Sequence, residues 1–448
     1  MLLRRYGTFT GGIDLPDEKH ATLDSPIRPC CRPERLLVPL APCDGPPAEP
    51  TIQVGQVVTA SQRIASSAGK EGVHVFAPLS GRVAAIGRAW VAGGQAFFAS
   101  PAIELVELSE PQPLAAVEPT FDWESAGPGD LLERISAGGL TTHRRPSQAL
   151  ANWLQNVRRR SCSVLIANVM ENQPYVTADH RLTAEHGREV VCGLAILARA
   201  AEIAEVIIAV DGRRTGDYRE LVAPARTHGI SRVALPHKYP TGADAILVKV
   251  LTRREVPPGG STMDVGAAVI DAATCFATYR WVVCGAPATA RVVTVSGERS
   301  GEPGNCWTPF GTPYQDLHVL NAQAPPQEHP LVCGGPMVGL PSPPGAVVSP
   351  GADAVLALDT PSLPSPGPCI RCGWCTDHCP ARLNVAALND AFELGLVEQA
   401  ARAVAPACVE CGVCSYVCPA RLPLSQRVRH LKRTILELRR AMPLFAAR

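Results

Sequence analysis

The sequence predicts a multidomain α/β protein, in which a small β domain and a parallel-sheet domain precede a helical domain rich in cysteine. Three observations support this prediction. The chain has 448 residues, enough for roughly three domains of about 150 residues each. Its hydrophobic content of 46% and charged content of 19% are typical of globular proteins. One twelve-residue cysteine pattern occurs twice near the C-terminus, at 369–380 and 408–419.

The first part of the chain predicts an extended arm over residues 1–25, followed by a β domain over 26–110. Short β-rich runs such as "ERLLVPL" alternate with turn signals throughout this domain. Two of the runs flank "PLSG" within 73–86, a pattern typical of a β-hairpin. The domain resembles a biotinyl- or lipoyl-type barrel sandwich, and its nearby lysine, Lys70, is interpreted as a solvated loop residue and not as a carrier.

The middle of the chain predicts an α/β domain over 125–288. Its apolar strands are "SVLIANV", "EVIIAV" and "SRVALP", and the helical segments between them place apolar residues three and four positions apart. This alternation indicates βαβ units and a parallel sheet, with a default ligand site at the carboxyl ends of the strands. No G-x-G-x-x-G follows any of these strands, so the ordinary dinucleotide fingerprint is absent. Residues 289–330 predict a small β-grasp module of strands and turns.

The repeated cysteine pattern is C-x2-C-x2-C-x3-C-P, in "CIRCGWCTDHCP" and "CVECGVCSYVCP". It is typical of bacterial ferredoxins with two [4Fe-4S] clusters, in which the fourth cysteine of each run binds the other cluster. A zinc site would need paired C-x2-C motifs without the third cysteine and the proline, so iron–sulfur is favoured. We therefore predict a ferredoxin-type domain over 365–425, with one cluster on Cys369, Cys372, Cys375 and Cys418, and the second on Cys408, Cys411, Cys414 and Cys379.

Because each run supplies ligands to both clusters, the clusters are expected to lie close together and to form a path for electrons. No separate catalytic residue is predicted. The other nine cysteines are expected to be reduced thiols, and they are Cys30, Cys31, Cys43, Cys162, Cys192, Cys275, Cys284, Cys306 and Cys333. Without a signal-peptide-like opening, they predict a reducing compartment such as the cytosol. No stretch is long and apolar enough to span a bilayer, so membrane contact is expected to be peripheral. The net charge of +1 gives no basis for nucleic-acid binding.

The order of parts resembles the RnfC family, the C subunits of the Rnf ion-translocating NAD:ferredoxin oxidoreductase. The resemblance is carried by segments along most of the chain, among them "GGIDLPDEK", "VFAPLSGRV", "NQPYVTADHRL", "KYPTGADAILVKVLTRREVPPGG", "RVVTVSGE", "CGGPMVG" and the two cysteine runs. It implies an electron-transfer subunit of a membrane complex that couples electron flow between NADH and ferredoxin to ion translocation. It implies the cytoplasmic face of the inner membrane as location, and the other subunits, with ferredoxin or flavodoxin, as partners.

The middle domain of that family is similar to the flavin subunit of respiratory complex I, which implies FMN as a cofactor and NAD(H) as a substrate. The resemblance assigns this site to Gly138, Gly139, Glu171, Tyr239 and Gly242. In the family, a glycine-rich loop of the type G-G-A-G-F-P-T-H closes on the flavin phosphate through its backbone N–H groups.

This chain departs from the family at that loop, where it has "TTHRRPSQ" at 141–148. Arg144 and Arg145 are expected to fill space that the flavin needs, and His143 is expected to be a solvated loop residue. Gln173 replaces an acidic residue of the family. The scaffold therefore implies FMN, whereas the loop argues against it.

Three interpretations remain open: a complex subunit with flavin, the same subunit as a flavin-less cluster wire and docking platform, or a soluble flavin and iron–sulfur reductase of the cobalamin-reductase type. The arm and the barrel sandwich argue against the third. Residues 424–442 predict a basic amphipathic helix. The helix either packs on its own domain with a solvated basic face, or it docks on acidic partner loops or anionic lipid.

Overall fold

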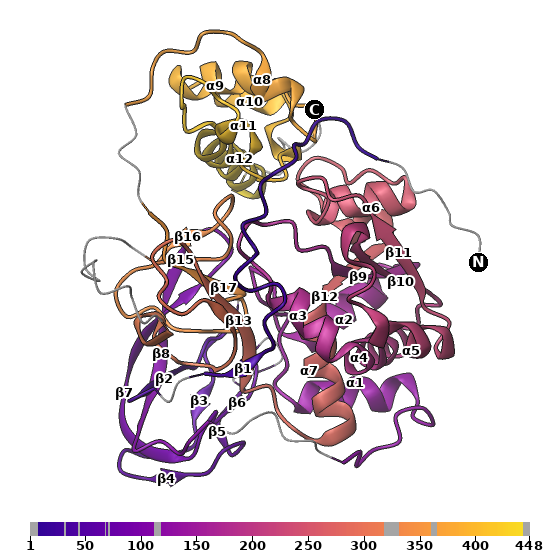
Figure 1. The fold of residues 1–448 in the computed structure, drawn as a ribbon, viewed down its shortest axis with the longest axis vertical. Helices are drawn as coiled ribbons and strands as arrows, with labels where there is room; N and C mark the ends of the chain where they lie inside the picture. Colours follow the sequence, from indigo (N-terminus) through magenta and orange to yellow (C-terminus); the bar gives the residue numbers. More distant parts are fainter. Residues whose placement is uncertain are drawn as a thin grey trace. The chain divides into compact units, whose positions relative to one another are not determined.

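The computed structural model describes residues 8–30, 33–43, 45–67, 69, 72–111, 118–317, 331–359 and 365–441. The chain divides into two compact units (Figure 1). The larger unit comprises 17–234 and 268–360, and it contains the sheets described below apart from the strand-end residues Leu235 and Ala267. The smaller unit comprises 1–16, 235–267 and 361–448, and it contains both cysteine runs. Lys70 and Cys31 lie outside the described residues.

The β domain at the start of the larger unit consists of two small sheets around one apolar core. The first sheet has four strands in the order β2 (Leu36–Pro39), β8 (Phe97–Val106), β7 (Gly81–Ala92) and β4 (Val57–Val58). The second sheet has three strands in the order β3 (Glu49–Pro50), β5 (Arg63–Ser66) and β6 (Val75–Phe76). Both sheets contribute to the core, for example through Val38 and Ile103 on one side and Ile64 and Val75 on the other.

The predicted hairpin around "PLSG" is wrong. β6 pairs with β5, whereas β7 pairs with β8 and β4, so the two runs belong to different sheets. The chain crosses between the sheets at 77–80 instead of turning back on itself.

A four-stranded sheet forms the centre of the α/β domain, as the strand–helix alternation predicts. Its strands are, in order across the sheet, β11 (Ser231–Leu235), β10 (Glu205–Asp211), β9 (Val164–Val169) and β12 (Ala267–Asp271). β10 and β9 pair in parallel, and every residue of β9 is buried, as expected for a parallel strand covered on both faces. The helices of this domain are α1 (Pro128–Ala137), α2 (Leu150–Arg159), α3 (Ala178–Glu185), α4 (Gly187–Ala201), α5 (Val222–Thr227) and α7 (Ala272–Cys284).

A six-stranded sheet completes the larger unit. Its order is β1 (Arg28–Pro29), β14 (Gly304–Pro309), β13 (Ala290–Ser296), β17 (Ala354–Leu356), β15 (Val332–Cys333) and β16 (Leu340–Pro341). β13 and β14 lie in the range predicted for the β-grasp module, and they pair antiparallel. The sheet also takes strands from outside the predicted range of 289–330, and residues 318–330 of that range lie outside the described residues.

The helices within and around the cysteine runs lie together in Figure 1. They are α8 (Trp374–Asp377), α9 (Val385–Glu393), α10 (Val397–Arg402), α11 (Val413–Tyr416) and α12 (Leu424–Ala441). The same unit includes α6 (Asp244–Thr252) and the arm from residue 8 to residue 16. Within the described part of the chain, no helix combines the length and the apolar character needed to cross a membrane.

The apolar stripe of α12 packs on its own domain. Leu424, Val428, Leu431 and Ile435 are buried in the core that surrounds the cysteine runs. Leu438, further along the stripe, is 46% exposed, and Met442 lies outside the described residues. Most of the described stripe is therefore covered within the chain itself, and docking of this helix through its basic side stays a prediction.

Close packing of α4 on α7 depends on a glycine in the middle of α4. A Cβ atom at Gly193 would lie 1.8 Å from the carbonyl oxygen of Cys275 in α7. In an exposed helix, replacing glycine by alanine normally stabilises by about 1 kcal/mol. Here the added methyl group would force the two helices apart.

We predict that Gly193→Ala lowers the thermal unfolding midpoint of the larger unit, because overpacking costs roughly 1–3 kcal/mol. Circular dichroism during heating measures this. Gly216→Ala is the matched control, since a Cβ at Gly216 would meet no atom within 4 Å. An unchanged midpoint for Gly193→Ala would contradict the close approach of the two helices.

Candidate iron–sulfur centre

The two cysteine runs have the same backbone conformation as well as the same spacing. Arg371 and Glu410, each directly before the second cysteine of its run, both have positive φ, +60° and +57°. Gly373 and Gly412, directly after that cysteine, have φ of +84° and +81° and begin the one-turn helices α8 and α11. Such left-handed residues fold a short peptide tightly, so that three cysteines separated by two residues each face one point.

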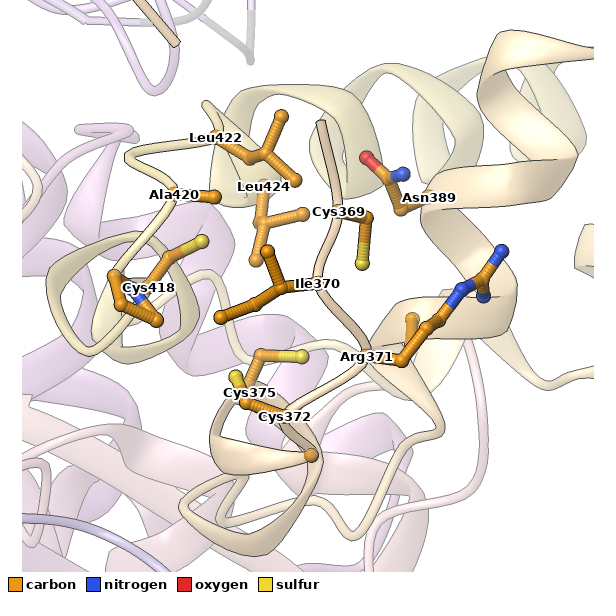
Figure 2. Close-up of a pocket in the computed structure, with 13 residues that line it drawn as sticks. Cys369, Ile370, Arg371, Cys372, Cys375, Asn389, Cys418, Ala420, Leu422 and Leu424 are labelled. Carbon is orange, nitrogen blue, oxygen red and sulfur yellow. The ribbon is translucent and has the colours of Figure 1, made fainter. Parts of the chain in front are cut away.

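Four cysteines from both runs line one pocket. Cys369, Cys372 and Cys375 come from the first run, and Cys418 comes from the end of the second. Figure 2 shows these four side chains around a common space, with Ile370, Leu422 and Leu424 as apolar neighbours. This is the set of four that the spacing predicts for one cluster, and it supports the crossed assignment.

The other four cysteines influence one another electrostatically. Burial raises the pKa of Cys408 to about 11 and that of Cys411 to about 12, and it also raises the pKa of Cys414. In each case a charge on Cys379, from the first run, raises the pKa further. Cys379 therefore lies near the three cysteines of the second run, as the crossed assignment requires.

This donor set fits iron–sulfur chemistry. Thiolates are soft ligands that favour iron–sulfur clusters or zinc, and four thiolates brought together need a positively charged group between them. Among the described residues, no three His, Cys, Asp or Glu side chains are grouped closely enough to hold a single metal ion. A cluster accommodates wider spacing, because its irons lie between the sulfur ligands.

Backbone N–H groups and charged side chains surround the second set of cysteines. The N–H of Glu410 donates to Cys408 Sγ at 3.3 Å, and the N–H of Leu383 donates to Cys379 Sγ at 3.4 Å. Lys432 of α12 donates to the carbonyl oxygen of Cys408 at 2.8 Å. Hydrogen bonds and net charge around a cluster are the interactions that set its reduction potential.

The charges beside the two runs differ. Glu410 forms ion pairs with both Arg429 and Lys432 of α12, at 3.2 and 2.8 Å. Together these three side chains leave one net positive charge beside the second set of cysteines. In the first run, Arg371 pairs with Asp390 at 2.7 Å, so those two charges cancel.

Close packing accounts for the two glycines assigned to the flavin site. A Cβ at Gly138 would lie 2.4 Å from Trp281 Nε1, and one at Gly139 would lie 2.3 Å from the carbonyl oxygen of His74. The Trp281 side chain and the His74 backbone therefore leave no room for a side chain at either position, whether or not a flavin binds.

The loop at 141–148 is filled by its own side chains. A Cβ at Gly334 would lie 2.3 Å from Arg145 Nη2, and one at Gly351 would lie 2.9 Å from Arg145 Cγ. Arg145 Nη1 is enclosed by protein without a hydrogen-bond partner. The arginine therefore occupies the space beside two glycine backbones, and the residues present do not fit a flavin phosphate as the family's glycine-rich loop does.

Two further side chains belong to the same arrangement. Gln173 Oε1 accepts from the N–H of Met337 at 3.3 Å, and Gln173 Cβ would lie 2.4 Å from a Cβ at Gly335. His143 is only 5% exposed, and its backbone N–H donates to Thr274 Oγ1 at 2.7 Å. The expectation that His143 is a solvated loop residue is wrong, since burial and the charge of Arg291 hold its pKa well below the usual value.

Glu171, also in the larger unit, caps a helix. Its carboxylate accepts the backbone N–H groups of Asp179 and His180, in the first turn of α3, at 3.2 and 3.1 Å. Lys19 of the "GGIDLPDEK" segment donates to the Glu171 carbonyl oxygen. Burial raises the pKa of Glu171 and lowers that of Lys19, while their opposite charges partly offset both effects.

Tyr239 and Gly242, the remaining residues of the predicted flavin site, belong to the smaller unit. Gly242 lies in the turn before α6. Tyr239 is 3% exposed, and its hydroxyl donates to the carbonyl oxygen of Cys411 at 2.6 Å. The sequence did not predict this contact, nor the one between Lys432 and the Cys408 carbonyl oxygen. No local pattern marks a side chain that donates to a carbonyl group far away along the chain.

Three family models match parts of the chain. Residues 7–105 match the RnfC barrel sandwich hybrid domain, 149–280 match the Nuo51 FMN-binding domain, and 364–425 match the 4Fe-4S dicluster domain. The barrel-sandwich, flavin-subunit-like and dicluster folds predicted from the sequence are thereby confirmed. The FMN-binding match begins directly after the loop at 141–148.

Relatives resemble the chain over most of its length. The C subunit of an ion-translocating oxidoreductase complex from Edwardsiella ictaluri is 34% identical over 85% of this chain, which spans 48% of that relative. The C subunit of the Clostridium ljungdahlii proton-translocating ferredoxin:NAD(+) oxidoreductase complex is 29% identical, covering 88% of this chain and 86% of its own. The corresponding C subunit from Rhodobacter capsulatus is 32% identical, covering 88% of this chain and 77% of its own. These similarities show that the chain belongs to the RnfC family, the C subunits of ion-translocating oxidoreductase complexes.

Proposed function

We propose that this chain is the iron–sulfur electron-transfer subunit of a membrane-bound, ion-translocating oxidoreductase that works between NADH and ferredoxin. The observation that carries the proposal is the grouping of the eight cysteines into two sets of four, each with three cysteines from one run and one from the other. The names of the Clostridium and Rhodobacter relatives support the class of reaction. Bound [4Fe-4S] clusters supply one-electron transfer without large structural change.

The side chains around the cysteines have separable roles in this proposal. The eight thiolates hold the clusters, and the backbone N–H groups of Glu410 and Leu383 stabilise negative charge on two of the sulfurs. Lys432, anchored by Glu410, holds positive charge beside the second set. Apolar residues such as Leu422 and Leu424 line the pocket of the first set.

The proposed partners are the other subunits of the complex, with ferredoxin or flavodoxin as exchange partner. The proposed location is peripheral, on the cytoplasmic face of the membrane. Both proposals rest on family membership and not on a particular contact of this chain.

A second candidate is the same subunit without flavin, and Arg145 favours it. NADH gives up its two electrons as hydride, whereas iron–sulfur clusters accept single electrons, so a flavin usually mediates between them. If Arg145 and Gln173 prevent flavin binding, this chain receives single electrons from another carrier of the complex. The cobalamin-reductase alternative has no comparable support, because the family shown is that of complex subunits.

We predict that paired cysteine substitutions reveal the crossed ligand sets. The wild-type chain should hold about eight irons after anaerobic reconstitution, and Cys418→Ala should hold about four. Adding Cys372→Ala to Cys418→Ala should remove no more iron, because both belong to one set. Adding Cys411→Ala should remove nearly all of it. The reverse result for the two double variants would show that each run binds its own cluster.

We predict that the wild-type chain binds FMN weakly and that added NADH does not reduce its clusters. Lost charge-assisted hydrogen bonds to phosphate cost roughly 1.5–3 kcal/mol each, or about one to two orders of magnitude in affinity. Fluorescence titration of FMN measures this, with Arg145→Ala expected to bind no more weakly than wild type. Arg159→Ala, an exposed arginine on α2, is the control. Tight wild-type binding that Arg145→Ala abolishes would instead make Arg145 a phosphate ligand and support a flavin.

We predict that reduced ferredoxin transfers electrons directly to this chain. In anaerobic stopped-flow mixing, the visible absorbance of the oxidised clusters should bleach within seconds. The variant with both Cys372→Ala and Cys411→Ala should show no bleaching, since each substitution removes a ligand of one cluster. Wild-type clusters that dithionite reduces but ferredoxin does not would contradict ferredoxin as the exchange partner.

A further inference from the structure

Tyr239 lies in the segment "KYPTGAD", which resembles the flavin and NADH site of the family, yet its polar atom contacts a cysteine run. The ring is buried, and the hydroxyl donates to the carbonyl oxygen of Cys411 at 2.6 Å. Cys411 is one of the four cysteines proposed to hold the second cluster. We infer that Tyr239 is a positioning residue for the second iron–sulfur cluster.

The backbone of Tyr239 is held by the arm. Its N–H donates to the carbonyl oxygen of Ile13 at 2.9 Å, and its own carbonyl oxygen accepts from the N–H of Ile13 at 3.0 Å. Lys238, next to it, donates to the carbonyl oxygen of Phe9 at 2.9 Å and lies over the Phe9 ring. These contacts with the arm fix the position of the Tyr239 backbone, and thereby the position from which the phenol hydroxyl reaches Cys411.

The arm also reaches the first cysteine run. The N–H of Gly12 donates to the carbonyl oxygen of His378 at 2.8 Å, directly before Cys379. A Cβ at Gly11 would lie 2.6 Å from the carbonyl oxygen of Cys379. Cys379 and Cys411 are assigned to the same cluster, so the arm and Tyr239 together touch the ligand loops of the second cluster from both runs.

This arrangement explains the two glycines of the arm. Gly11 and Gly12 both have a φ of +73°, a conformation that favours glycine. A Cβ at Gly12 would lie 2.5 Å from the carbonyl oxygen of Tyr239. Side chains at these positions would separate the arm from Tyr239 and from Cys379.

The electrostatic effect of the phenol has a definite sign. Reduction adds a negative charge to the cluster and its ligands, and the hydroxyl hydrogen places partial positive charge next to the Cys411 peptide. Hydrogen bonds to the residues that hold a cluster tune its reduction potential and orient its ligands. Removing the hydroxyl should therefore disfavour the reduced state and loosen the Cys411 loop.

The experiment replaces Tyr239 by phenylalanine in two backgrounds, each with one cluster removed. Cys372→Ala leaves only the second cluster, and Cys411→Ala leaves only the first. We measure the midpoint potential by EPR-monitored titration and the rate of iron release to a chelator. Tyr175→Phe is the matched control, since its hydroxyl bonds Glu298 in the larger unit.

In the Cys372→Ala background, Tyr239→Phe should lower the midpoint potential and speed iron release roughly two- to twelvefold, as loss of one net hydrogen bond implies. In the Cys411→Ala background, Tyr239→Phe should leave the midpoint potential and the rate of iron release unchanged. If Tyr239→Phe abolishes the second cluster in the Cys372→Ala background and leaves the first cluster intact, that result equally supports the inference. No change in the first background, or equal changes in both, would overturn it. The inference rests on the proposed clusters, and the iron content of the wild-type chain tests those separately.

Discussion

Charge compensation among eight cysteines is the constraint on which the smaller unit depends. Four thiolates brought together in a largely buried space repel one another, and burial adds to the cost of their charge. The structure accepts this arrangement twice, with backbone that has the same left-handed residues at Arg371 and Glu410. In the proposed crossed ligand sets, Cys379 and Cys418 make each run contribute to both clusters.

The surrounding elements follow from that constraint. α12 buries Leu424, Val428 and Leu431 against the cysteine runs and delivers Lys432 to the Cys408 carbonyl group. A basic amphipathic helix is often taken as a docking element. Here its apolar side completes the core, and part of its basic side neutralises Glu410 and supports ligands.

Much of this could be predicted from the sequence, because the information is local. The spacing within each cysteine run encodes the ligands, and the alternation of apolar strands and helices encodes the parallel sheet. The hairpin at 73–86 failed because strand partners are chosen by long-range pairing, which the two runs themselves do not specify. His143 was misassigned for the same reason, since Thr274, which its backbone N–H contacts, is 131 residues away. The contact of Tyr239 with Cys411 was missed because those residues are 172 positions apart.

The residues of the predicted flavin site also have structural roles that need no flavin. Gly138 and Gly139 are needed for packing on Trp281 and His74, and Glu171 is needed to cap α3. Such residues would persist without a flavin, so their presence does not demonstrate one. Arg145 is the more informative residue, because a charged side chain enclosed without a hydrogen bond on Nη1 is costly unless it serves another purpose. Either it meets a phosphate, or it fills the space where one would have been. The two cases differ in what loss of the arginine does to FMN affinity, and they decide whether electrons enter this chain in pairs or singly.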